Sequence, residues 1–168
     1  MVLTAGCNFI SPQTTTEHYE ASDGTSIDVG KIEVRNAMVF TDDSGETASL
    51  SVTVLNTGDS TASVGFQYTS SVAGDTTETV SVPANGQTRR GTQGGDKQII
   101  LSDIDKKPGT LLKVFIQSGD TTGKTLSIPV LDGSFSQYKT LLPSPSPIST
   151  PTATPLISTP TATTTPTP

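Results

Sequence analysis

The segment 48–54, Ala-Ser-Leu-Ser-Val-Thr-Val, alternates apolar and hydroxyl side chains without interruption. A period of two places the apolar side chains on one face of an extended strand and the hydroxyls on the other. Its β-branched residues also favour strands over helices. The segment therefore predicts a β-strand with one buried face and one solvent-facing face.

Similar patterns on both sides of this segment predict further strands. Upstream, Ile32, Val34, Met38 and Phe40 alternate with polar or small residues, which places these four side chains together on a buried face. Further strands are predicted at 62–68, 76–82, 87–90, 98–101, 110–117 and 124–131, with turns rich in Gly, Asn, Asp and Pro between them. No segment has a helical period. The pattern predicts an all-β fold, an antiparallel β-sandwich with immunoglobulin-like architecture.

The chain divides into three regions. Residues 27–142 are expected to form the single folded domain, and the polar residues 1–26 a truncated signal remnant followed by a tether. Residues 143–168 carry no charge and hold eight of the twelve prolines, and the heptapeptide Ile-Ser-Thr-Pro-Thr-Ala-Thr occurs at 148–154 and again at 157–163. This composition predicts a disordered Ser/Thr/Pro-rich tail.

Cys7, the single cysteine, follows Leu3-Thr4-Ala5-Gly6. Small residues before a cysteine are what lipoprotein signal peptidase accepts, so Cys7 is the predicted site of lipidation (palmitate) and membrane anchoring outside the cytoplasm. Only six residues precede it, fewer than a complete signal peptide requires. In one interpretation, Met1 is an internal residue of a longer precursor. In the other, Met1 is the true start and Cys7 is an ordinary residue of the N-terminus. We favour the lipidated interpretation.

Charge and residue inventory exclude several classes of function. A net charge of −6 argues against a nucleic-acid partner, and no stretch approaches the ~20 apolar residues of a membrane-spanning helix. The single histidine, His18, lies in the tether, where no scaffold would hold it as a general base. No Gly-x-Ser-x-Gly motif is present either. We expect no enzymatic activity and find no small-molecule substrate.

Metal binding has little support in the sequence. Transition-metal sites need clusters of Cys, His or Met, and the chain has one Cys, one His and two Met. Calcium is harder to exclude, because oxygen ligands occur in two acidic turns. These turns hold Asp42, Asp43 and Glu46 in one case and Asp103 and Asp105 in the other. Neither turn matches a calcium-binding loop, so we expect solvated charges, with no metal and no cofactor.

A set of short motifs gives the chain a family resemblance between Cys7 and about Pro143. These are Gln13-Thr14, Tyr19-Glu20-Ala21-Ser22-Asp23-Gly24, Val29-Gly30, Val34-Arg35-Asn36, Leu55-Asn56, Ile128-Pro129-Val130, Tyr138 and Leu142-Pro143. The chain resembles actinobacterial envelope lipoproteins of the LpqE-like group. The resemblance implies a cupredoxin-like β-sandwich, distantly similar to the periplasmic copper chaperones called PCuAC. It also implies an accessory, non-catalytic subunit of the cytochrome bcc–aa3 respiratory supercomplex.

The copper ligands of the PCuAC group can be compared with this chain. That group carries a Gly-Gly-x-His-x-Met stretch, and the matching stretch here is Gly94-Gly95-Asp96-Lys97-Gln98-Ile99. Lys97 stands at the histidine position and Ile99 at the methionine position, and neither side chain is a soft ligand. Met38 alternates with Phe40, so we expect it to pack in the core. The usual copper site is not predicted.

Three functions remain to be compared. The leading one is a lipid-anchored, extracytoplasmic binding module that docks on a membrane protein complex, with cytochrome bcc–aa3 as the suspected partner. Copper delivery is a second, for which the ligands are missing. A cell-wall-associated adhesion or ligand-binding module is a third, although sugar-binding aromatics are few, with no Trp and only Tyr19, Tyr68 and Tyr138 as tyrosines.

Overall fold

A computed structural model describes residues 22–144, so Cys7, His18 and Tyr19, with most of the predicted tether and tail, lie outside the described residues. The nine strands of this part are β1 (Thr25–Val29), β2 (Ile32–Thr41), β3 (Thr47–Asn56), β4 (Ala62–Ser70), β5 (Gly74–Val82), β6 (Gly86–Arg90), β7 (Ile99–Ser102), β8 (Leu111–Ser118) and β9 (Lys124–Leu131). Each predicted strand is present, and β1 is an addition. The all-β fold class is confirmed, while the domain boundaries 27–142 stay a prediction.

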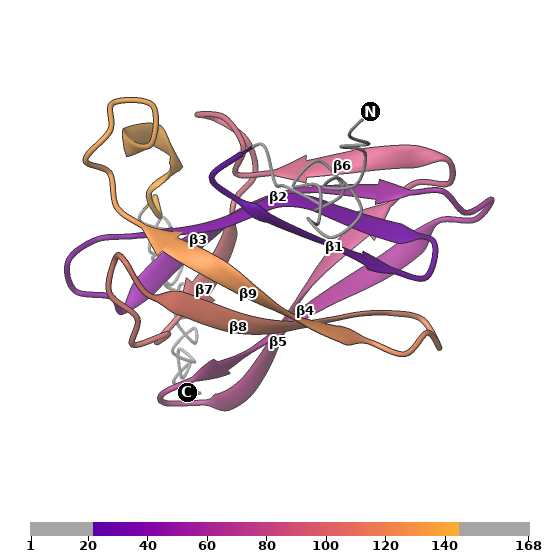
Figure 1. Cartoon of the computed structure of the whole chain (residues 1–168), viewed down its shortest axis with the longest axis horizontal. Coiled ribbons are helices and arrows are strands. Elements are labelled where there is room, and N and C mark those ends of the chain that lie inside the picture. Colours follow the sequence, from indigo (N-terminus) through magenta and orange to yellow (C-terminus); the bar gives the residue numbers. More distant parts are fainter. Residues whose placement is uncertain (1–21, 145–168) are drawn as a thin grey trace, which may run out of the picture.

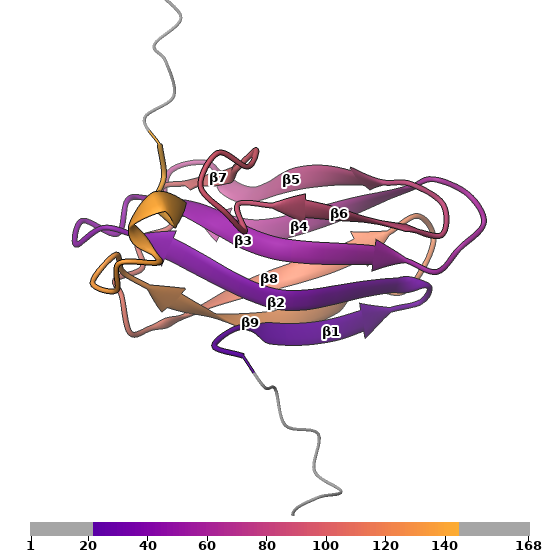
Figure 2. The ribbon, with the colours of Figure 1, turned by 90° about the horizontal axis from the view of Figure 1, so that it is seen from above.

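The strands form two facing layers that share strand β9 (Figures 1 and 2). Hydrogen bonding gives the order β5-β4-β8-β9-β2-β3-β6, with β1 paired to β2 and β7 paired to β3. Strand β9 is antiparallel to β8 along most of its length, but its end pairs in parallel with β2, at Val39 and Val130. The predicted sandwich is therefore curled into one mixed sheet, and this parallel pair departs from the antiparallel expectation.

The main core fills the space between the layers. In β3, Ala48, Leu50, Val52 and Val54 are all fully buried in it, as their alternation predicts. From the other layer come residues such as Phe66, Ile116 and Ile128, which are also fully buried. Removing this apolar surface from water, at roughly 25 cal/mol per Å², is the main stabilising term for a chain whose described part contains no cysteine.

Strand β2 changes faces at a β-bulge. Its pairing with β3 shifts between Arg35 and Met38, and Asn36 adopts a left-handed conformation with φ of 51°. An inserted residue reverses the side-chain alternation that follows it. Ala37 and Val39 consequently point into the main core, whereas Met38 and Phe40 point to the opposite side. The prediction that Met38 and Phe40 share a face with the residues before the bulge is wrong for this reason.

A second, smaller core covers that opposite side of β2. Met38 and Phe40 pack there against Leu141, and Leu131, Tyr138 and Leu142 contribute partly buried side chains. Most of these partners belong to residues 132–144, which we call the C-terminal hook; it contains the short 3₁₀ helix η2 (Lys139–Leu141). Figures 1 and 2 show the hook curling back beside β2 and β3. Ser49 and Ser51 of β3, expected to face solvent, are also buried.

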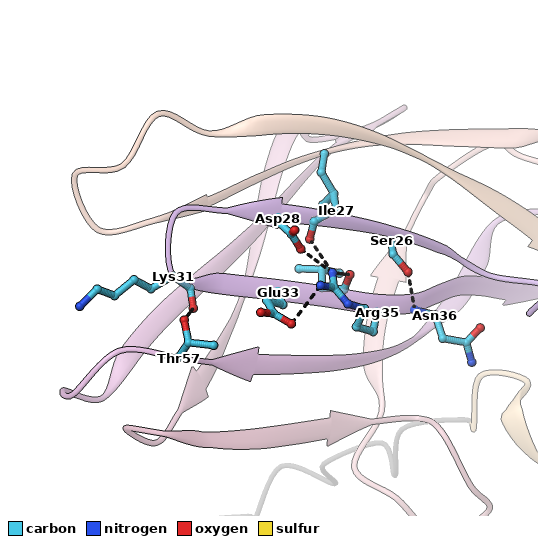
Figure 3. A network of polar contacts seen from close by, with 9 residues as sticks. Ser26, Ile27, Asp28, Lys31, Glu33, Arg35, Asn36 and Thr57 are labelled. Carbon is cyan, nitrogen blue, oxygen red and sulfur yellow. Dashed lines mark hydrogen bonds and ion pairs between the residues drawn. The ribbon is translucent and has the colours of Figure 1, made fainter. Parts of the chain in front are cut away.

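Strand β1 is joined to β2 by a polar network on their outer surface (Figure 3). The Arg35 guanidinium donates to the carboxylates of Asp28, at 2.5 Å, and Glu33, at 2.9 Å, and to the carbonyl oxygen of Ile27 at 3.5 Å. Nearby, the hydroxyl of Ser26 accepts a hydrogen bond from the Asn36 backbone N–H at 3.3 Å. The bulge that redirects β2 is thus also a point of attachment for β1.

Candidate functional site

The loop between β6 and β7, residues 91–98, contains most of the stretch matched above to the copper motif. The carboxylate of Asp96 organises it by accepting hydrogen bonds from the Thr92 hydroxyl at 2.7 Å and from the backbone N–H groups of Thr92 and Gln93, both at 3.1 Å. The Thr92 hydroxyl is the largest cause of a pKa of Asp96 below its ordinary value of 3.8. The loop is therefore held by its own carboxylate.

Gln98 fastens this loop to the C-terminal hook. Its carboxamide nitrogen donates to the carbonyl oxygens of Leu141, at 3.3 Å, and Leu142, at 2.9 Å. Its carboxamide oxygen accepts from the Ser144 backbone N–H at 3.0 Å. Gly94 lies so close to Thr140 that a Cβ there would stand 3.0 Å from the Thr140 Cβ. One side chain thus binds three backbone polar groups, of Leu141, Leu142 and Ser144, at the end of the described chain.

The residues at this position do not fit Cu(I). Lys97 is exposed and ends in an ammonium group, and Ile99 begins β7 with its aliphatic side chain in the main core. Neither side chain presents a soft donor. Met38 is 7 % exposed and lies between Phe40 and Leu141 in the second core, where its role is packing, as predicted. Within residues 22–144, no group of three or more Cys, His, Asp or Glu side chains is arranged to hold a metal. We derive no copper chemistry for this loop.

The two acidic turns singled out in the sequence come together. The Ile104 N–H donates to the Glu46 carbonyl at 3.1 Å, and the Lys106 N–H donates to the Gly45 carbonyl at 3.2 Å. The hydroxyl of Ser44 donates to the Asp42 carboxylate and lowers the pKa of Asp42 from its ordinary value. Asp42 is thereby engaged in stabilising its own turn. Lys106 follows Asp103 and Asp105 in the same loop.

Aromatic side chains mark the outer surface of the hook. Phe135 is exposed and meets the ring of Tyr138 edge-on, with centroids 5.9 Å apart, while Tyr138 lies 5.0 Å from Phe40 beneath it. The Tyr138 hydroxyl donates to the carboxylate of Asp23, which raises the pKa of Tyr138. The beginning and the end of the described chain therefore meet at this ring. Tyr68, by contrast, is buried in the main core.

Sequence reasoning identified the 91–98 loop but missed the hook that lies against it. The hook could have been found from its apolar residues. Leu131 ends the last predicted strand, and Tyr138, Leu141 and Leu142 follow it before the uncharged tail begins. Apolar residues placed in this way after a strand indicate a segment that returns to cover exposed apolar surface.

Within the described residues, no helix is long and apolar enough to cross a membrane.

Solved structures of PCuAC domains have a similar fold. The copper-bound PCuAC domain from PmoF2 matches with 18% identity and a TM-score of 0.50, over 64% of this chain and 98% of that domain. The apo PmoF2 PCuAC domain matches with 18% identity and a TM-score of 0.51, over 66% and 98%. No family model and no curated protein sequence matches the chain. At this identity the likeness concerns the fold, and it confirms the predicted distant similarity to PCuAC at that level.

The described part of the chain is thus a β-domain whose fold is similar to that of PCuAC domains. Its loop 91–98 is held by hydrogen bonds of Asp96 and Gln98. The residues at the histidine and methionine positions of the copper motif, Lys97 and Ile99, are not soft ligands. Membership of the LpqE-like group stays a prediction.

Proposed function

We propose that this protein is a non-catalytic, extracytoplasmic binding module that keeps a PCuAC-like fold and binds a protein partner without carrying copper. One observation carries the proposal. The Gln98 carboxamide makes three hydrogen bonds to the C-terminal hook beside Lys97 and Ile99, so the region matched to the copper motif is used for internal packing. A binding module with this fold and without soft ligands would bind its protein partner through surface residues and not through a bound metal.

Lipidation of Cys7 supplies the second element of the proposal. Buried acyl chains contribute ~0.8 kcal/mol per CH₂ to membrane binding, and stable anchoring generally takes two such signals. A protein confined to a membrane surface meets a membrane-embedded partner at a raised effective concentration, so a modest interface suffices. By its resemblance to the LpqE-like group, the proposed partner is the cytochrome bcc–aa3 supercomplex, on which this module acts as an accessory subunit.

A copper titration separates this function from chaperoning. The full chain carrying Cys7→Ser and His18→Ala is titrated with Cu(I) against a chromophoric chelator, with the unsubstituted chain beside it. The two substitutions remove the thiol and the imidazole, so any remaining tight site must lie in the folded part. We expect no stoichiometric competition from the doubly substituted chain. Tight one-to-one binding by that chain would overturn the proposal.

Fractionation and copurification test the anchor and the partner. Cys7→Ser in the full precursor is expected to move the protein from the membrane to the soluble fraction, with Thr4→Ser as a matched control that stays bound. Retention of Cys7→Ser in the membrane contradicts the anchor. Affinity-tagged cytochrome bcc–aa3, solubilised gently, is expected to bring the wild-type protein with it. Its absence from that preparation contradicts the proposed partner.

A further inference from the structure

The outer face of strands β4, β5 and β8 is hollowed around a glycine in the middle of a strand. Gly65 of β4 lies opposite Thr79 of β5 and Gln117 of β8 in the sheet. Its neighbours Val64 and Phe66 point into the main core, so position 65 faces outward. Gly65 lies in the floor of an open hollow of about 470 Å³ on this face, a volume within the range of ligand-binding clefts.

The backbone does not require glycine at position 65. Its φ does not lie in the left-handed region, unlike that of Gly30 or Gly74. A Cβ at position 65 would stand 3.2 Å from the Thr77 methyl, closer than an ordinary contact, so Thr77 would have to shift to admit a side chain there. Glycine in a strand interior weakens the strand and commonly marks a place where another molecule approaches the backbone closely. The glycine thus accommodates the Thr77 side chain and also keeps the floor of the hollow low.

The wall of the hollow is polar and uncharged. It presents hydroxyl groups and carboxamides, with one aromatic ring at its side: Ser63, Thr77, Thr79, Gln67, Gln117 and Phe115. Hydroxyls and carboxamides both donate and accept hydrogen bonds. Gln117 and Thr79 are exposed, and the Gln117 carboxamide makes only a long contact of 3.5 Å with the Gly119 carbonyl. These groups are available to a ligand.

Phe115 is fixed beside the hollow. The tip of its ring lies against Gly123, the last residue of the turn before β9, so closely that a Cβ on Gly123 would overlap the ring. The ring is half-buried and lines the hollow on its β8 side. An aromatic ring next to hydroxyls and amides offers an apolar contact together with directional hydrogen bonds. Phe115 was not among the aromatic residues weighed from the sequence, where only tryptophan and the three tyrosines were considered.

We propose that this hollow binds a neutral saccharide, such as an uncharged glycan of the cell envelope. An anionic ligand would find no cation in the wall, and a purely apolar ligand would leave the hydroxyls and carboxamides without partners. A neutral sugar supplies many hydroxyls that both donate and accept, together with C–H groups for the edge of Phe115. This inference is independent of the protein partner proposed above.

The test measures binding of neutral trisaccharides to the full chain by saturation-transfer NMR and calorimetry. The probes are maltotriose, mannotriose and tri-N-acetylglucosamine, with trigalacturonate as the charged control and a synthetic peptide of residues 148–163 as the polypeptide control. We expect at least one neutral probe to bind with a Kd below about 10 mM and neither control to bind as well. No binding of any neutral probe, or tighter binding of trigalacturonate or the peptide, would overturn the proposal.

Two substitutions locate the binding. Gly65→Val fills the hollow with a residue that favours strands, and Gln117→Ala removes one carboxamide without changing the backbone. Each is expected to weaken binding roughly tenfold or more, which corresponds to the loss of one or two hydrogen bonds. Thr69→Val, on the same strand but outside the hollow, is the matched control and should bind as the wild type does. Binding by Gly65→Val and Gln117→Ala as tight as that of the wild type would overturn the assignment.

Discussion

The hydroxyl oxygen of Tyr68 in β4 accepts a hydrogen bond from the backbone N–H of Ser102 at the end of β7, at 3.0 Å. The bond crosses from one layer of the fold to the other, because β4 and β7 belong to different layers. The Tyr68 ring is buried in the main core, and this burial is the largest cause of its raised pKa. A core side chain thus fixes the end of the short strand β7, which follows the 91–98 loop.

Tyr68→Phe is expected to lower the free energy of unfolding by about 1–2 kcal/mol, because the Ser102 N–H loses its partner while the ring stays packed. Urea denaturation measures the change. Tyr138→Phe is the matched control: it also removes one hydroxyl hydrogen bond, to Asp23, but at the exposed surface of the hook, and should cost less. A larger loss for Tyr138→Phe than for Tyr68→Phe would contradict this account.

Asn56→Asp is expected to destabilise the fold by about 2–3 kcal/mol at neutral pH. The buried Asn56 carboxamide donates to the carbonyl oxygens of Ser60, at 2.8 Å, and Pro83, at 3.1 Å, and accepts from the Gly58 N–H. A carboxylate cannot donate and would face these oxygens. Thermal unfolding should show part of the loss recovered at low pH, where the new carboxyl is protonated. A pH-independent loss would contradict the explanation.

Gln98→Ala is expected to release the C-terminal hook without unfolding the main core. The substitution removes three hydrogen bonds, to Leu141, Leu142 and Ser144, worth about 1–3 kcal/mol together. Hydrogen exchange should accelerate in residues 138–144 and stay slow in β4 and β8. Gln93→Ala is the control, because the Gln93 side chain is exposed in the same loop. Similar exchange in both variants would show that Gln98 does not hold the hook.

The 91–98 loop should loosen in acid. Because hydrogen bonds from Thr92 and Gln93 hold the pKa of Asp96 below 3.8, its carboxylate stabilises the folded loop above about pH 4. That contribution is lost as the pH falls through the depressed folded pKa. NMR should show the amide signals of Thr92 and Gln93 shifting together below pH 4. The shift should vanish in Asp96→Asn, and its persistence there would assign it to another group.

Local pattern was sufficient to predict most of the strands. In β3 the alternation from Ala48 to Val54 is uninterrupted, and every predicted apolar position is buried. That Lys97 and Ile99 offer no soft donor could also be read from residue identity, since a protonated ammonium cannot ligate and an aliphatic side chain has no donor atom. These predictions needed only the chemistry of each residue and the period of its neighbours.

Features that depend on distant contacts could not be predicted in this way. The bulge at Asn36 reverses the face to which each later side chain of β2 points. The alternation of apolar and polar residues does not by itself show where the extra residue lies. Strand β1 carries polar side chains whose partners lie on other strands: Thr25 bonds to Ser127, Ser26 to Asn36 and Asp28 to Arg35. The hollow at Gly65 exists because Thr79 and Gln117 lie on either side of it, and they are brought there by two separate strand pairings.

The parallel pairing of Val39 with Val130 has a consequence for the order in which the chain folds. Hairpins such as β2–β3 and β4–β5 close over short loops, whereas this contact must wait until β9 has been synthesised and has found β2 across some ninety residues. Contacts between residues far apart in sequence slow folding. Until β9 arrives, the two halves of the core expose their apolar faces. A chain of this design therefore spends its most aggregation-prone interval as two unjoined half-sandwiches.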